Sequence, residues 1–167
     1  MRERIWAEMV DSKYKICYLG FYLSKQRTNN KYFNIFILVF STTGVLGWPI
    51  LKELPFISSI IVMGMSIIKL IGTEFIPNDN TFKKIEKAID LYCDHFNKIE
   101  NLWYEFERES VNETKAQKKF YSIMNEEKEM NRIVNEIIKD GNNKIQNKAE
   151  IHSTNYFNNI FNQTSNE

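Results

Sequence analysis

The sequence predicts an all-α protein: a membrane helical hairpin of two transmembrane helices, with cytosolic amphipathic and coiled-coil helices around it. Two observations predict the hairpin. Residues 32–51 contain no charge, and residues 54–76 contain only Lys69 and Glu74 as charged residues. About 20 apolar residues are needed for a helix to cross the roughly 30 Å hydrocarbon core of a bilayer. A third observation, heptad apolar spacing after residue 79, predicts the cytosolic helices.

The whole-chain totals exclude several classes of function. A chain of 167 residues suits one domain. Its net charge of +1 provides no overall field for nucleic acid, so any anion site must be a local cluster. Cys17 and Cys93 lack metal-ligand spacing and are interpreted as small buried thiols. The mean hydropathy of −0.40 conceals the apolar block.

Residues 1–31 are predicted to form an N-terminal cytosolic amphipathic helix. This segment holds ten charged residues and no long apolar run, so it does not resemble a cleavable signal peptide. Its apolar positions recur at helical spacing. They are Trp6, Val10, Cys17 and Phe21.

Residues 32–76 are predicted to form the two-transmembrane hairpin, with its turn at Lys52 and Glu53. Pro49 should kink or end the first helix, and Pro55 suits the first turn of the second. The N-terminal arm carries seven Lys and Arg residues, whereas the turn has only Lys52. Positive residues stay on the cytoplasmic side, so both termini are expected there.

Residues 79–139 are predicted to form a cytosolic helical bundle or coiled coil. Ser110 and Glu113 have the spacing of a capping box, which favours an antiparallel pair of helices over one long helix. Glu127 interrupts the apolar face of the second helix. Residues 140–167 are expected to be an Asn-rich, loosely attached tail. The heptad seam of the first helix comprises Ile85, Ile89, Tyr92, Phe96, Ile99, Trp103 and Phe106.

The sequence indicates no enzyme. The six glycines form no phosphate loop, and His95 and His152 are the only histidines. Asp94 and His95 are adjacent on a helix and do not converge on one point, so His95 is interpreted as solvated or at the edge of the core. No catalytic residue, metal or cofactor is predicted.

Small polar residues within the apolar block suggest either close helix packing or an aqueous path. Ser59, Ser66 and Lys69 fall on one helical face together with Met63. One hairpin cannot enclose a pore, so a pore requires a homo-oligomer of about four copies. The predicted pore-lining residues are Ser59, Met63, Ser66, Lys69, Ser41 and Thr42.

This layout resembles the SLATT superfamily of two-transmembrane effectors. The resemblance rests on the basic, polar lead-in at 24–31, the Ser-Thr-Thr-Gly segment at 41–44, the short turn and the long helical segment that follows. It implies a pore-forming effector of bacterial anti-phage operons, encoded beside a nucleotide-producing enzyme. The membrane component of the Hailong defence system is similar in kind. There a nucleotidyltransferase makes a DNA oligomer that holds the channel shut, whereas related systems open with a cyclic nucleotide.

A nucleotide ligand would need cations facing its phosphates. Two lysine-rich clusters could instead anchor the chain to anionic lipid, and a third, Lys115, Lys118 and Lys119, could be a solvated face. The predicted ligand-binding residues are Lys25, Arg27, Lys31, Lys83, Lys84 and Lys87.

The sequence thus predicts a homo-oligomeric channel in the bacterial cytoplasmic membrane. The expected ligand is a nucleotide or DNA oligomer made by a partner nucleotidyltransferase, and opening would depolarise the membrane and arrest growth. One alternative is a non-conducting membrane anchor or scaffold that recruits a partner enzyme through its helices. Another is a soluble α-helical bundle with an unusually apolar hairpin.

Overall fold

The computed structural model describes residues 1–46, 59–60, 63–64, 66–68, 70, 79–138 and 141–161, with side chains of the first range described as far as residue 39. The long helices are α1 (Arg2–Leu46), α4 (Asp79–Glu107), α5 (Glu113–Ile137) and α6 (Asn143–Phe161). The described residues confirm an all-α protein. The chain divides into a bundle unit, Met1–Leu23 with Lys83–Glu167, and an apolar unit, Ser24–Phe82.

The prediction of two membrane-spanning helices is wrong for the described residues. Among them, no helix combines the length and the apolar character that crossing a bilayer requires. In α1 the apolar run begins at Tyr32 and the described helix extends to Leu46, so this described part holds fewer than the roughly 20 residues needed. The predicted multi-pass membrane localisation and the membrane-channel interpretation depended on those two helices and are therefore corrected as well. The predicted turn at Lys52 and Glu53, with Pro49 and Pro55, lies outside the described residues.

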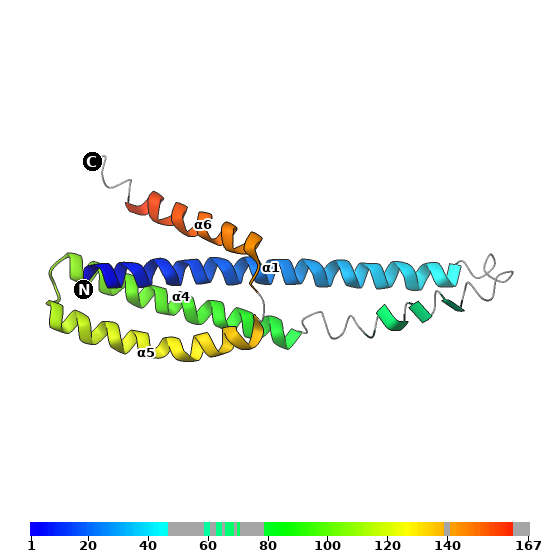
Figure 1. The fold of residues 1–167 in the computed structure, drawn as a ribbon, viewed down its shortest axis with the longest axis horizontal. Coiled ribbons are helices and arrows are strands. Elements are labelled where there is room, and N and C mark those ends of the chain that lie inside the picture. The colour runs from blue at the N-terminus through cyan, green and yellow to red at the C-terminus, as the bar shows by residue number, and fades with distance from the viewer. Residues whose placement is uncertain are drawn as a thin grey trace. The chain divides into compact units, whose positions relative to one another are not determined.

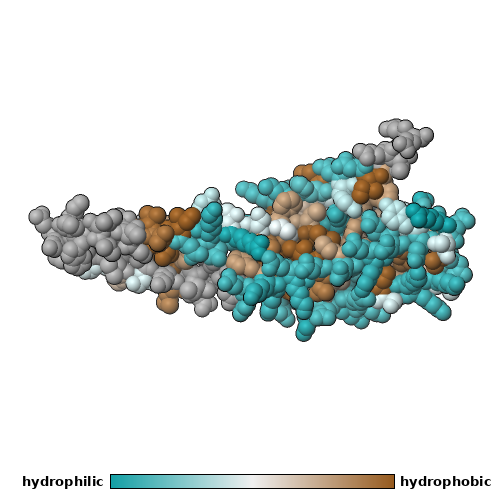
Figure 2. All heavy atoms as spheres, turned by 180° about the vertical axis from the view of Figure 1, so that it is seen from behind, coloured by the Kyte–Doolittle hydropathy of each residue, from teal (hydrophilic) through white to brown (hydrophobic). Residues whose placement is uncertain are grey.

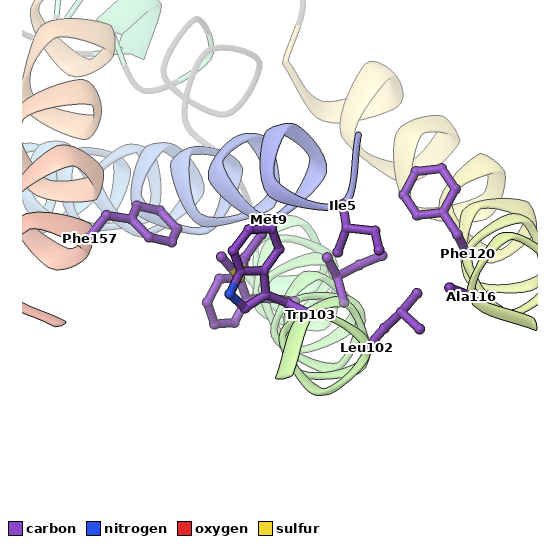
Figure 3. Packing of buried hydrophobic residues seen from close by; sticks show 9 residues of the cluster. Ile5, Met9, Leu102, Trp103, Ala116, Phe120 and Phe157 are labelled. Atoms are coloured by element: carbon purple, nitrogen blue, oxygen red, sulfur yellow. The ribbon is translucent and has the colours of Figure 1, made fainter. Parts of the chain in front are cut away.

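The bundle unit packs four helical segments against one another (Figure 1), and their described residues bury two apolar clusters. Five of the seven residues in the predicted seam of α4 are buried, and Ile89 and Phe106 are half-buried. Figure 3 shows Ile5 and Met9 of α1 beside Trp103 and Leu102 of α4, with Phe120 of α5 approaching the same cluster. The most buried seam residues, all less than one tenth exposed, are Ile85, Tyr92, Phe96, Ile99 and Trp103.

Helices α4 and α5 form the antiparallel pair that the sequence favours (Figure 1). The helix break falls where the capping pattern lies, but Asn112 rather than Ser110 is the N-cap. The Asn112 side chain accepts a hydrogen bond from the backbone N–H of Lys115 at 3.0 Å. Ser110 Oγ instead donates to the carbonyl of Glu105 at 2.7 Å and closes the end of α4.

Residues 143–161 form helix α6 instead of the expected loose tail. The helix buries Ile145, Ala149, Ser153 and Phe157, which recur every four residues along one face. Phe157 joins the core cluster (Figure 3). Only two of these four side chains, Ile145 and Phe157, are large and apolar, which is a weak sequence signal for packing.

Helix α1 is covered on two faces, and the sequence analysis identified only one of them. The predicted face contacts α6: the rings of Trp6 and Phe157 lie 5.3 Å apart, and those of Phe21 and His152 lie 4.9 Å apart. The fully buried face belongs to a different set of residues. That set is Ile5, Met9, Ser12, Leu19 and Leu23.

The described side chains of the apolar unit include many exposed hydrophobic groups. By contrast, hydrophilic side chains predominate on the face of the bundle unit that Figure 2 shows, with hydrophobic residues in patches among them. The exposed large residues of the apolar unit are Tyr32, Ile35, Phe36, Leu38, Val39, Ile60, Met63, Ile67, Ile68 and Leu70.

Candidate functional site

A network of polar side chains lies between α1, α4 and α5 inside the bundle unit. At its centre, Lys15 Nζ lies 2.6 Å from Glu127 Oε1 and 2.7 Å from Asp11 Oδ2. Asn131 Nδ2 donates to the same Glu127 oxygen at 3.1 Å. Tyr92 then donates its hydroxyl hydrogen to Asn131 Oδ1 at 2.6 Å. These bonds link one charged residue of α1 to the buried faces of both neighbouring helices.

A second part of the polar network involves His95, which the sequence analysis placed in solvent or at the core edge. That interpretation is wrong, because His95 is only 1% exposed. Its Nε2 lies 3.0 Å from Glu8 Oε1, which also accepts from Ser12 Oγ at 3.3 Å. His95 Nδ1 is buried and has no hydrogen-bond partner among the described residues. His95 lies three residues after Tyr92 and four before Ile99, so its side chain is on the same buried side of α4.

The surroundings of the central ion pair hold both partners in their charged forms. Burial disfavours the Lys15 ammonium, but the hydrogen bonds that it donates to Asp11 and Glu127 outweigh burial and raise the pKa of Lys15 well above its usual value. Burial likewise opposes ionisation of Glu127, yet Lys15 and Asn131 outweigh it, so the pKa of Glu127 lies below its usual value. Burial alone dominates at Tyr92 and raises its pKa to about 12.

The three carboxylates of the polar network could in principle hold a metal ion. Oxygen atoms of Glu8, Asp11 and Glu127 all lie within 4.8 Å of one another. The Lys15 ammonium already lies against two of these carboxylates and supplies the positive charge that a cation would bring. The arrangement therefore suits a partly buried ion pair that sets how α1 packs against α4 and α5.

A pocket of about 330 Å³ adjoins the polar network. We call it the tyrosine pocket. All four helical segments of the bundle unit contribute to it, and Lys15, Tyr92 and Asn131 belong both to the network and to the pocket wall. The other lining residues are Tyr14, Tyr18, Leu19, Val134, Asn135, Ile138, Gly141 and Gln146.

The structure does not gather the predicted pore-lining residues into a described site. Ser59, Met63 and Ser66 are exposed helical residues of the apolar unit. Lys69 lies outside the described residues, and Ser41 and Thr42 belong to α1 but their side chains are not described. Their predicted role in a pore depended on two membrane-spanning helices, and no such helix is found among the described residues.

The predicted ligand-binding cations are exposed and are divided between the two units. Lys25, Arg27 and Lys31 lie on the part of α1 that belongs to the apolar unit, and the other three lie on α4 in the bundle unit. Within the second group, Lys84 Nζ is 3.5 Å from a carboxylate oxygen of Glu136. Neither group lines the tyrosine pocket. The second group comprises Lys83, Lys84 and Lys87.

Sequence reasoning missed the polar network, although one signal for it was visible. Glu127 interrupts an otherwise apolar face of α5, and a carboxylate there needs a cation from another helix. The sequence does not say which cation, because Lys13 and Lys15 are both near the required level of α1. The structure assigns Lys15 to Glu127, whereas Lys13 Nζ lies 3.5 Å from the centre of the Tyr156 ring.

The described residues define an all-helical bundle with a partly buried ion-pair network. No family model, no curated protein and no solved structure matches the chain.

Tyr92 should make the protein sensitive to alkali. A phenol whose pKa is raised on folding stabilises the fold below its unfolded value of 10.0, and that contribution is lost as pH rises toward about 12. Replacing Tyr92 with phenylalanine should cost about 1 kcal/mol at neutral pH, for the lost hydrogen bond. It should also flatten the fall in stability above pH 10. Urea denaturation followed by circular dichroism at several pH values measures both effects.

The exposed Tyr104 provides a matched control for this experiment. Tyr104→Phe removes a hydroxyl from the same helix at a position that is 38% exposed. Its stability should follow the wild-type pH dependence. An unchanged alkaline slope in Tyr92→Phe would contradict the role assigned to the Tyr92 hydroxyl.

Proposed function

We propose that this chain is a non-catalytic helical assembly protein. Copies associate through the apolar unit, and the bundle unit recruits a partner. The observation that supports this most directly is the set of exposed hydrophobic residues at heptad spacing in the apolar unit. We do not propose a conducting pore, because no described helix meets the requirements for a membrane span.

The exposed hydrophobic residues at 60–70 follow the pattern of a helix–helix interface. Ile60, Met63, Ile67 and Leu70 are separated by three, four and three residues. They are 52%, 58%, 49% and 73% exposed, respectively. Apolar side chains at alternating three- and four-residue intervals line up on one side of a helix and insert between the side chains of a facing helix. The spacing therefore favours another helix as the occupant.

Helix α1 carries a second exposed seam of the same kind. Tyr32, Ile35 and Val39 are separated by three and four residues and are 67%, 44% and 52% exposed. Soluble monomers rarely leave apolar patches this extensive in water. Because no charge lies between 32 and 51, the seam offers no ionic selectivity for a charged partner. A second copy of the chain presents the same apolar seams and would bury both, as symmetric assemblies do.

The resemblance to two-transmembrane effectors supplies a biological setting for such an assembly. In that setting the chain would act beside a nucleotide-producing enzyme in bacterial anti-phage defence, and the enzyme is a candidate partner for the bundle unit. A nucleotide ligand would contact the exposed Lys83 and Lys87 rather than a buried site. The scaffold role does not require this ligand.

Light scattering coupled to size-exclusion chromatography tests the assembly. The purified chain should elute as an oligomer at micromolar concentration, well above the chain mass of 19.9 kDa. Ile60→Glu combined with Ile67→Glu places a carboxylate at two seam positions and should shift the mass to that of one chain. The double variant should keep its helical circular dichroism, because both side chains are exposed.

Gln117→Glu combined with Asn125→Glu is the matched control, since it adds the same charge at exposed positions of α5. This variant should remain oligomeric. A monomeric wild-type chain would contradict the proposal. So would flotation of the chain with phospholipid vesicles in place of self-association, because lipid would then cover the seams.

A further inference from the structure

The tyrosine pocket has the dimensions and lining of a small-molecule site. Its volume of about 330 Å³ lies at the lower end of the range for ligand pockets, roughly 300–1,000 Å³. Its walls combine aromatic and aliphatic side chains with a few polar groups, which is the usual composition of such sites. This pocket lies wholly within the bundle unit, so it does not depend on whether copies assemble.

The pocket walls suit a flat ring. The rings of Tyr14 and Tyr18 follow each other along α1, with centroids 6.2 Å apart and planes inclined by 32°. Leu19, Val134 and Ile138 complete the apolar lining. Aromatic faces and branched aliphatic side chains stack on planar heterocycles with little dependence on their identity.

Two side-chain amides can form hydrogen bonds with the edge of such a ring. The carboxamides of Asn135 and Gln146 line the pocket and make no hydrogen bond with a described residue. Each offers both donors and an acceptor, which match the alternating donors and acceptors of a heterocycle. Gly141 leaves room for Gln146, because an added Cβ at Gly141 would lie 3.1 Å from Gln146 Nε2.

The charge beside the pocket disfavours an anionic ligand. Lys15 is the only cation among the described lining residues, and its ammonium already lies 2.7 Å from Asp11 and 2.6 Å from Glu127. Two carboxylates contact this ammonium, and oxygen atoms of Glu8, Asp11 and Glu127 all lie within 4.8 Å of one another, so the described charged groups here are mostly acidic. A phosphate entering the pocket would meet like charge and, among the residues that the structure describes there, no uncommitted cation. We infer that the tyrosine pocket binds an uncharged, planar heteroaromatic molecule of about the size of a nucleoside.

Binding of nucleosides to the full chain tests this inference. Adenosine, guanosine, cytidine and uridine, each with its 5′-monophosphate, are titrated by isothermal calorimetry. At least one nucleoside should bind saturably, and its monophosphate should bind at least about tenfold more weakly. Gln146→Leu and Asn135→Leu each remove a carboxamide at similar volume and should weaken nucleoside binding by about tenfold. Val134→Trp should fill the pocket and abolish binding.

Matched controls separate the pocket from the rest of the surface. Gln117→Leu and Asn125→Leu make the same chemical changes at exposed positions of α5 away from the pocket, and binding should be unchanged. Circular dichroism confirms that each variant is folded. Saturable binding of none of the four nucleosides would overturn the inference. So would a monophosphate that binds as tightly as its nucleoside, or an equal loss of binding in the controls.

Discussion

Replacing Lys15 with methionine should lower the free energy of unfolding by about 3 kcal/mol. Removing one partner of a buried ion pair leaves the other charge without compensation, which typically costs about 3–5 kcal/mol. We expect the lower end, because the Lys15 side chain is 28% exposed and the Glu127 side chain is 13% exposed. Urea denaturation at fixed protein concentration, followed by circular dichroism, measures the change.

Two further variants identify the cause of this loss. Lys118→Met makes the same change at an exposed position of α5 and should alter the stability by less than about 0.5 kcal/mol. Adding Glu127→Leu to Lys15→Met removes the uncompensated carboxylate and should recover much of the loss. A double variant no more stable than Lys15→Met would show that the ion pair is not what the methionine disrupts.

The loss should also depend on pH with a defined sign. The pKa of Glu127 is lowered in the folded chain, so its ionised form stabilises the fold at neutral pH. That contribution disappears as pH falls through the folded value, because the carboxyl becomes neutral in both states. The difference between wild type and Lys15→Met should therefore shrink in acid. A difference that stays constant down to low pH would contradict the assignment.

Replacing Trp103 with alanine should lower the free energy of unfolding by about 3–5 kcal/mol, the usual cost of emptying an aromatic core position. Trp103 is 7% exposed, and its ring centroid lies 5.1 Å from that of Trp6. Arg2 also lies over the Trp103 ring at 5.4 Å, with its guanidinium bonded to Glu107. The indole thus joins the start of α1 to the end of α4, and its loss should loosen that end of the bundle.

The neighbouring Tyr104 supplies the comparison for Trp103. Tyr104→Ala also removes an aromatic ring, but that ring is 38% exposed, so the loss should be about 1 kcal/mol or less. Chemical denaturation of both variants measures the difference. Equal losses of stability in the two variants would contradict the prediction that the buried Trp103 ring contributes more than the exposed Tyr104 ring.

Some of the fold could be predicted because it follows from local pattern. The α4 seam, with Ile85, Tyr92 and Ile99, has strict heptad spacing, and such spacing places its residues on one face whatever the helix packs against. The break between α4 and α5 follows from polar capping residues that satisfy backbone groups within a few positions. The N-cap of α5 is Asn112 and not the predicted Ser110, and this difference of two residues does not change the topology.

The membrane interpretation failed because hydropathy alone does not set where a helix begins and ends. An apolar stretch at 32–51 was treated as a span of its own, whereas α1 runs from Arg2 to Leu46 and joins the polar arm to part of that stretch. Composition identifies residues that avoid water. It does not distinguish lipid from other helices as the surroundings that those residues require.

By itself, the sequence determined that this protein is helical, where α4 and α5 are divided, and which side of α4 is buried. Periodicity and capping decide these features within a single helix. Only the tertiary structure decided that Lys15 pairs with Glu127, that His95 is buried against Glu8, and that α6 covers Trp6. These contacts join residues about 90 to 150 positions apart in the chain, and which partners meet depends on how whole helices rotate and pack.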